Sequence, residues 1–212
     1  MKTDQFINML STNLEPADRG KMSRLLTAAV VLGLTIAIGA AWSILGFRPD
    51  YFAPDAVVFL CVKLLFAGSA AVLAGFYLIK SARPGSDRKI PFAVALPFAA
   101  IVLLAIASVS LAPGSHWKEM VSHDEWLECL ISIPLIAIVP FAVLVWVVRQ
   151  AAPTNLVRTG ALIGVAAGSI SAIGYALHCS ADSWPFVAIW YGGTIALCVL
   201  AGAALGPRLL RW

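Results

Sequence analysis

Six long apolar stretches constrain this chain more than any other feature of its sequence. Each has about the 20 residues that a helix needs to cross a bilayer, and only one charged residue, Lys63, falls inside any of them. A helix of a soluble protein keeps polar residues along one face, and these six stretches have no such face. One soluble core could not bury six helices that are apolar all round. We therefore predict an all-α membrane protein, a bundle of six transmembrane helices. The predicted spans cover residues 25–46, 56–79, 90–112, 129–148, 159–177 and 185–206, within one membrane domain of residues 25–212.

The first stretch is predicted to be a retained span and not a cleavable signal peptide. It follows a polar segment, residues 1–24, that contains Asp4, Glu15 and Asp18, and it is longer than the usual signal-peptide core of about 7–15 residues. The strands of an outer-membrane barrel would alternate apolar and polar residues, and no stretch here does so.

The distribution of lysine and arginine predicts that both termini are cytoplasmic. Twelve of the fifteen basic residues lie in the N-terminal segment, the second and fourth loops and the C-terminus. The first, third and fifth loops hold only Arg48 and Lys118, together with seven acids. Basic loops remain on the cytoplasmic side, so the odd loops are expected outside. The net charge of +4 is thus a signal of topology, and no basic face with interleaved aromatic residues predicts direct binding of nucleic acid.

With this orientation, the three histidines and two of the four cysteines lie near the outer face. Cys129 begins the fourth span, and Cys179 follows His178 in the short polar segment ALHCSADSW between the last two spans. Three interpretations remain open. The thiols could form a disulfide in an oxidising compartment, or they could bind a soft metal ion together with His178 and His123. Alternatively, they are small apolar residues at helix ends. The chain has no CxxC or HxxxH spacing to favour the metal site.

Local patterns predict several structural features of the last three spans. Ser122 and Glu125 have the spacing of a capping box that would start the fourth span near His123, and Asp182 or Ser183 can cap the sixth. Small residues at every fourth position of the fifth span predict close packing against another helix, or a face of a homo-oligomer. These residues are Gly160, Gly164, Gly168, Ala172 and Ala176.

Lys63 is the one intramembrane charge, and such a group is expected to face the interior with a partner. No acid inside a predicted span matches it. An alternative interpretation follows from this residue: a small metal-ion permease whose outer Cys/His cluster is the entry site. An enzyme is not predicted, since the chain has no GxSxG, no HExxH, no phosphate-binding glycine loop and no paired intramembrane carboxylates.

The N-terminal segment is the most structured candidate for a cytoplasmic interaction. Phe6, Met9, Leu10 and Leu14 recur at helical spacing, and Pro16 would end the helix. A free helix of about 12 residues is marginal in water, so it would gain order by laying its apolar face in a groove of a partner or on the membrane surface.

Three stretches together resemble one family of membrane regulators. They are MKTDQFINML at the start, CLISIPLIAIVPF from Cys129, and GALIGVAAGSISAIGYALHCSADSWPFVAIWY in the last third. The chain resembles the NrsF family along its whole length, most specifically in the HC…DS…PF…WY pattern. Members of this family are six-span anti-sigma factors of the inner membrane of Gram-negative bacteria, and they hold an extracytoplasmic-function (ECF) sigma factor inactive.

The resemblance implies roles for residues already singled out. It implies that residues 1–16 engage an ECF sigma factor and that Cys129 and Cys179 sense oxidative or heavy-metal stress. No cofactor is required on this interpretation, and a thiophilic metal ion would be a signal. The resemblance does not decide between thiol oxidation and metal capture.

Overall fold

The structure, a computed structural model of the chain, describes residues 20–48, 53–81, 92–122, 125–151 and 153–211. These residues form helices joined by short connections and contain no strand. The N-terminal segment with Phe6, Met9, Leu10 and Leu14 lies outside the described residues, as does His123.

Six helices of the described chain are long and apolar enough to cross a membrane, which confirms the predicted fold class of a multi-pass, all-α membrane protein. The third span joins the 3-10 turn η1 (Phe92–Ala95) to α4, and the sixth joins α8 (Trp184–Phe186), the π-helical η3 (Val187–Tyr191) and α9. The long helices are α2 (Lys21–Ile44), α3 (Pro54–Ser81), α4 (Leu96–Leu111), α6 (Trp126–Arg149), α7 (Leu156–Ala176) and α9 (Gly192–Leu209).

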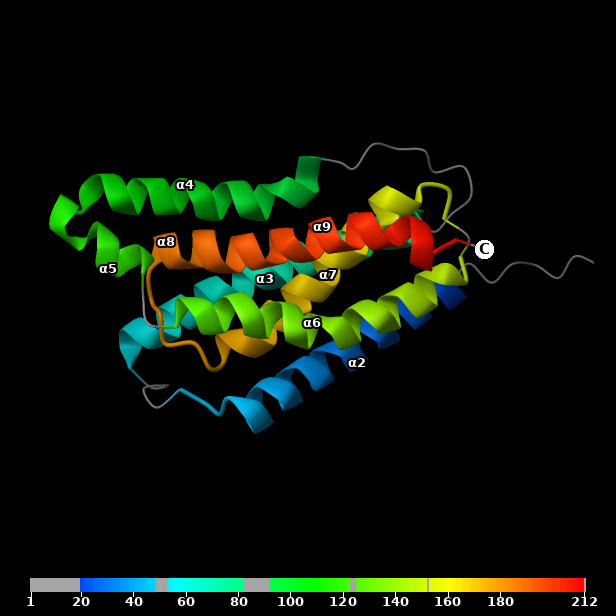
Figure 1. Cartoon of the computed structure of the whole chain (residues 1–212), viewed down its shortest axis with the longest axis horizontal. Helices are drawn as coiled ribbons and strands as arrows, with labels where there is room; N and C mark the ends of the chain where they lie inside the picture. The colour runs from blue at the N-terminus through cyan, green and yellow to red at the C-terminus, as the bar shows by residue number, and fades with distance from the viewer. Residues whose placement is uncertain (1–19, 49–52, 82–91, 123–124, 152, 212) are drawn as a thin grey trace, which may run out of the picture.

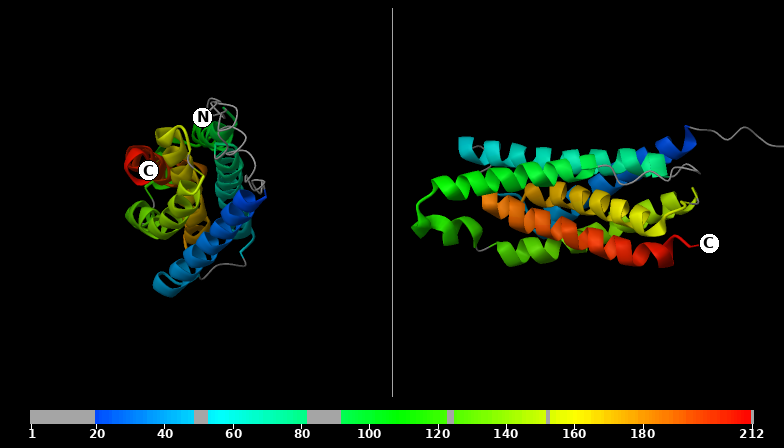
Figure 2. Two further views of the ribbon diagram at one scale, coloured as in Figure 1. Left: turned by 90° about the vertical axis from the view of Figure 1, so that its right-hand side faces the viewer. Right: turned by 90° about the horizontal axis from the view of Figure 1, so that it is seen from above.

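The long helices run side by side along one axis, so that their connections gather at two opposite ends (Figures 1 and 2). The start of α2 and the end of α9 lie at the same end, which is the arrangement that an even number of spans requires. The opposite end holds the chain after α2, the short helix α5 (Trp117–Val121) and residues 177–183, here named the Cys179 loop.

Helix α7 forms the centre of the bundle. In the most apolar 18-residue stretch of α7, 72% is buried inside the bundle, whereas the corresponding share in the other five spans is 17–33%. The small residues predicted to form a packing ridge explain this position. A Cβ added to Gly160 or Gly164 would collide with a backbone carbonyl oxygen of α9, and one added to Gly168 would lie 3.1 Å from Cβ of Cys198. The ridge is therefore a contact inside the bundle, where it lets two backbones approach closely.

Helix α2 also packs closely against α6 and α7, through small residues. A Cβ on Gly174 would lie 2.7 Å from the carbonyl oxygen of Ala37, and one on Gly33 would lie 3.2 Å from Cβ of Pro140. Helix α2 ends at Ile44, and Gly46 follows its C-cap Leu45; the left-handed backbone of Gly46 (φ 81°) turns the chain towards the Cys179 loop.

The two predicted helix starts have different outcomes. Ser183 caps the last span as expected, because its side chain accepts a hydrogen bond from the backbone N–H of Phe186. The predicted capping box was wrong: α6 begins at Trp126 with Glu125 at the N-cap, three residues after the expected start. The Glu125 carboxylate instead binds Ser180 in the Cys179 loop, a partner that lies 55 residues along the chain.

The contact between α7 and α9 generates a stability prediction. Gly164→Ala should lower the free energy of unfolding by about 1–3 kcal/mol, because its methyl group must push two backbones apart. Gly68→Ala on α3 is the matched control, since nothing lies within 4 Å of the added Cβ. The measurement is the thermal midpoint of each purified variant in detergent. A Gly164→Ala variant as stable as Gly68→Ala would contradict the close contact.

Candidate functional site

A buried ionic cluster lies where the Cys179 loop folds back onto the bundle. The side chain of Lys63, on α3, is fully buried. Its Nζ donates hydrogen bonds to the backbone oxygen of Cys179 at 2.9 Å and to Oδ1 of Asp182 at 3.1 Å. Desolvating an ammonium group is costly unless it is paired and hydrogen-bonded. Asp182 is therefore the acid that the predicted spans did not contain, and it reaches Lys63 from a loop.

Arg48 holds the same carboxylate from the other side. Its Nη2 lies 2.8 Å from Oδ2 of Asp182 and its Nη1 lies 3.2 Å from Oδ1, an arrangement in which the guanidinium binds both oxygens. Nη1 also donates to the backbone oxygen of Cys179 at 3.4 Å, and the backbone N–H of Arg48 donates to Leu177 at 3.5 Å. Since Arg48 follows α2 directly, these contacts tie the first span to the Cys179 loop.

His178 and Cys179 are neighbours in sequence but face different surroundings. Nδ1 of His178 donates to the backbone oxygen of Gly46 at 3.1 Å, and Nε2 lies 3.5 Å from the Glu128 carboxylate. The His178 ring is 20% exposed, whereas Cys179 is fully buried among Tyr175, Tyr191 and Phe186. His178 thus joins the loop to the end of α2, and Cys179 points into the bundle.

Glu125 brings Cys129 and Cys179 to the same level of the bundle. The backbone N–H of Cys129 donates to the backbone oxygen of Glu125, one helical turn earlier. The carboxylate of Glu125 accepts hydrogen bonds from the backbone N–H of Ser180, at 2.9 Å, and from its hydroxyl group. Cys129 and Cys179 are both fully buried in one apolar cluster, as expected for helix ends that face each other across an antiparallel pair.

The surroundings of Cys179 act on its ionisation in opposite directions. Burial raises the pKa of the Cys179 thiol above its usual value, while the Lys63 ammonium and the Tyr191 hydroxyl lower that pKa. Nζ of Lys63 lies 3.6 Å from Sγ of Cys179. The Tyr191 hydroxyl is beside the thiol without a hydrogen bond of good geometry to a described residue. The resting thiol is therefore protonated at neutral pH, with a cation already in contact.

The described residues bring together some of the predicted site residues but not all. All four cysteines are described and carry free thiols; Cys61 is exposed and Cys198 lies between α7 and α9. Within the described residues no group of three histidine, cysteine or acidic side chains has a metal-binding arrangement. His123, the remaining predicted ligand, lies outside them.

Sequence reasoning missed Arg48, Asp182 and Glu125 as members of this cluster. Each lies outside the predicted spans and counts in a sequence only as a polar loop residue. One feature of the sequence pointed to Asp182. An intramembrane lysine needs an acid, and Asp182 lies three residues from the only cysteine that follows a histidine.

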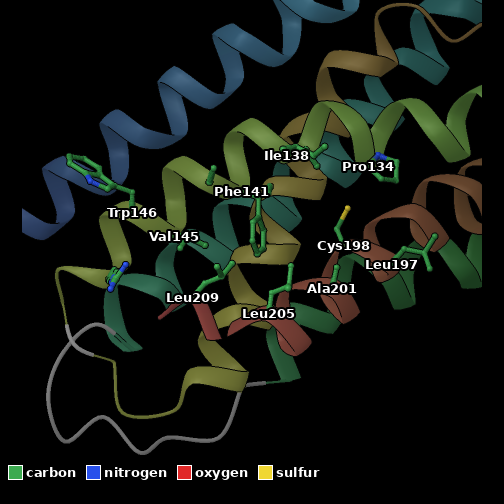
Figure 3. A pocket seen from close by; sticks show the side chains of 14 residues that line it. Pro134, Ile138, Phe141, Val145, Trp146, Leu197, Cys198, Ala201, Leu205 and Leu209 are labelled. Atoms are coloured by element: carbon green, nitrogen blue, oxygen red, sulfur yellow. The ribbon is translucent and has the colours of Figure 1, made fainter. Parts of the chain in front are cut away.

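A groove lies elsewhere along the helices, away from the ionic cluster. A groove of about 670 Å³ runs between α6 and α9 over α7, and the side chains of Phe141 and Leu205 project towards it (Figure 3). Arg149 is the one charged residue among those that line it. Such an apolar lining suits lipid chains and offers little chemistry, so the ionic cluster is the stronger functional candidate.

Comparison with known proteins places this chain in a family. The family model described as "Negative regulator of sigma F", NrsF, matches residues 10–212. The chain belongs to the NrsF family. It is 28% identical over 220 residues to the anti-sigma-F factor NrsF of Caulobacter vibrioides. It is 25% identical over 213 residues to the probable anti-sigma-F factor NrsF of Azospira oryzae. Both alignments cover 100% of each chain.

The NrsF family is regulatory and not catalytic, in agreement with the absence of enzyme motifs in the sequence. No solved structure matches the chain.

The contacts of Glu125 generate a prediction about the Cys179 loop. Glu125→Ala removes two hydrogen bonds to a carboxylate, each worth about 1.5–3 kcal/mol. Amide hydrogen exchange in residues 177–183, measured by mass spectrometry, should accelerate by about tenfold or more. Glu128→Ala is the matched control, because its carboxylate is 40% exposed and lies 3.5 Å from its histidine partner. Equal exchange in the two variants would mean that Glu125 does not hold the loop.

Proposed function

We propose that this protein is a membrane-bound anti-sigma factor of the bacterial inner membrane that sequesters an ECF sigma factor and releases it under stress. The observation that carries this proposal is the family match over residues 10–212, together with two full-length relatives that are named anti-sigma-F factors. Family membership favours this function over the alternative of a metal-ion permease.

The proposed output is the N-terminal segment. With cytoplasmic termini, residues 1–24 form a sizeable polar segment on the side of the membrane where a sigma factor is found. The apolar face of Phe6, Met9, Leu10 and Leu14 suits a hydrophobic groove on such a partner. The remaining connections at that end of the bundle are short, so this segment offers the most surface for recognition.

The proposed input is the thiol pair Cys129 and Cys179. Both thiols are free and buried in one cluster at the end of the bundle opposite the start of α2. Joining two thiols in a disulfide removes two electrons and two protons, which a hydroperoxide can accept while it is reduced to an alcohol and water. Capture of a thiophilic ion would instead release the thiol protons to solvent. Either event requires the buried loop to rearrange.

The contacts between the Cys179 loop and α2 support a route from input to output. Arg48 and Gly46 hold the loop through Asp182, Leu177 and His178. Helix α2 then passes over α6 and α7 through Gly33 and Ala37, and its other end carries the N-terminal segment. A rearranged loop would release the end of α2 and allow that helix to shift, a movement of the kind that couples sites in other membrane and subunit interfaces.

The N-terminal proposal is tested by changing Phe6 and Leu10 together to Asp. This double variant should insert normally but lose its sigma factor, because two carboxylates cannot enter an apolar groove without a large desolvation cost. Co-purification of the sigma factor should fall, and transcription of its target genes should rise without stress. The control changes Asn8 and Asn13, which lie between the apolar positions, to Asp. Full repression by the Phe6/Leu10 variant would contradict the role of this segment.

The thiol proposal is tested by Cys129→Ser and Cys179→Ser. Each should preserve insertion and binding of the sigma factor while abolishing induction, because the thiolate is the reactive or ligating form. Cys61→Ser and Cys198→Ser are the controls and should induce normally. His178→Ala separates the two signals: it should raise the inducing dose of metal by about tenfold if the site captures metal. If the thiol pair is oxidised instead, His178→Ala should change only the rate of induction. Normal induction in both single variants would refute the sensor.

A further inference from the structure

Lys63 has an environment that structural ion pairing does not fully explain. The side chain is fully buried, and its Nζ lies against three groups of the Cys179 loop: the backbone oxygen of Cys179, Oδ1 of Asp182 and Sγ of Cys179. The same ammonium lies 5.9 Å from the centre of the Tyr191 ring. A lysine needed only to neutralise Asp182 would not have to contact a thiol.

The carboxylate of Asp182 neutralises Lys63 only in part. Both of its oxygens are bound by Arg48, at 2.8 and 3.2 Å, and Lys63 shares only Oδ1, at 3.1 Å. An ammonium in a low-dielectric site attracts further negative charge strongly. The nearest group of the loop that can acquire a charge is the thiol at 3.6 Å.

We propose that Lys63 is the counter-ion of a Cys179 thiolate, which makes Cys179 the nucleophilic member of the thiol pair. This inference rests on the proposed sensor function and identifies which thiol reacts first. Cys129 lies one turn after Glu125 and also experiences the charge of Lys63, but the contact of Nζ at 3.6 Å is with Sγ of Cys179. Lys63 thus distinguishes two thiols that are otherwise equally buried.

The reaction begins with the loss of the thiol proton to solvent on the side of Asp182, whose carboxyl is 19% exposed. The electron pair left on Sγ is stabilised by the ammonium of Lys63 and attacks an electrophile. With methyl methanethiosulfonate as the probe, Sγ bonds to the methylthio sulfur, the S–S bond of the probe breaks, and methanesulfinate leaves with the electron pair. The probe is small and uncharged, so Lys63 neither attracts nor repels it.

Other ionisable groups also face Cys179 and stay unchanged in the experiment. They are Arg48 after α2, Asp182 in the loop, Glu125 and Cys129 at the start of α6, Tyr175 on α7 and Tyr191 on η3. A change at Lys63 alone therefore reports its own charge against a constant background.

The experiment measures the rate at which methyl methanethiosulfonate modifies each cysteine of the full-length protein in detergent, followed peptide by peptide by mass spectrometry between pH 6.5 and 9. Cys179 should react faster than Cys129. Lys63→Gln should slow the modification of Cys179 by about tenfold or more at each pH, the effect of raising its pKa by about one unit. Lys63→Arg should restore the rate to within about threefold, because it restores the charge. Lys80→Gln, a change of the other α3 lysine, is the matched control and should change nothing.

The sign of the effect separates a counter-ion from a structural residue. If Lys63 only held the loop closed, Lys63→Gln would open it and Cys179 would react faster. Hydrogen exchange in residues 177–183 reports that opening independently. An unchanged or faster rate at Cys179 in Lys63→Gln would overturn the proposal, as would faster modification of Cys129 than of Cys179 in the wild type.

The modification rates distinguish a failure of this inference from a failure of the sensor proposal. The modification rates need no sigma factor and no inducer, so they test the chemistry of Cys179 directly. Normal induction of both Cys129→Ser and Cys179→Ser would refute the sensor and leave the charge effect of Lys63 measurable. Loss of induction in Cys179→Ser with no effect of Lys63→Gln on the rates would refute the counter-ion and leave the sensor intact.

Discussion

The carboxylate of Asp182, shared between Lys63 and Arg48, is the interaction on which the arrangement of this end of the bundle depends. A fully buried lysine requires an acid, and removing one partner from such a buried pair costs about 3–5 kcal/mol. Because the acid lies in a loop, the loop must fold inward to reach the lysine. The inward course of the loop places Cys179 in the apolar cluster beside Tyr175 and Tyr191. The ionic contact and the burial of the thiol are therefore one structural event.

Close packing by small residues gives the bundle a different kind of constraint. The backbones of α7 and α9 meet at Gly160, Gly164 and Gly202, where no side chain separates them. Helix α2 meets α7 at Gly174 and α6 through Gly33. The centre of the bundle is thus held by backbone contact, while the position of α2 also depends on the polar contacts of Gly46 and Arg48 with the Cys179 loop.

These two constraints together describe how a small membrane protein can transmit a signal. The described residues have no separate sensory or effector domain, so in the proposed function a chemical change at the Cys179 loop acts through a helix that reaches the opposite end of the bundle. Helix α2 is suited to this task, since one of its ends contacts the Cys179 loop and the other continues into the N-terminal segment. Buried ion pairs have sharply defined partners, and losing one partner leaves an uncompensated charge. The cluster is consequently better suited to switching between two arrangements than to gradual deformation.

Sequence alone determined the fold class and the number of spans, because apolar stretches of bilayer length leave a chain few alternatives. It also limited the small residues of α7 to close helix packing or a homo-oligomer face, and the cap of the last span to Asp182 or Ser183, since both depend on spacing within one element. It indicated that Lys63 needs a partner, yet it could not name Asp182, Arg48 or Glu125. Those contacts join residues up to 134 positions apart, and they depend on how deeply a loop re-enters the bundle. Tertiary structure decided that depth through the pairing of buried charges. It also separated His178 from Cys179 in the turn that ends α7, where His178 bonds to Gly46 after α2 and Cys179 is buried in the core.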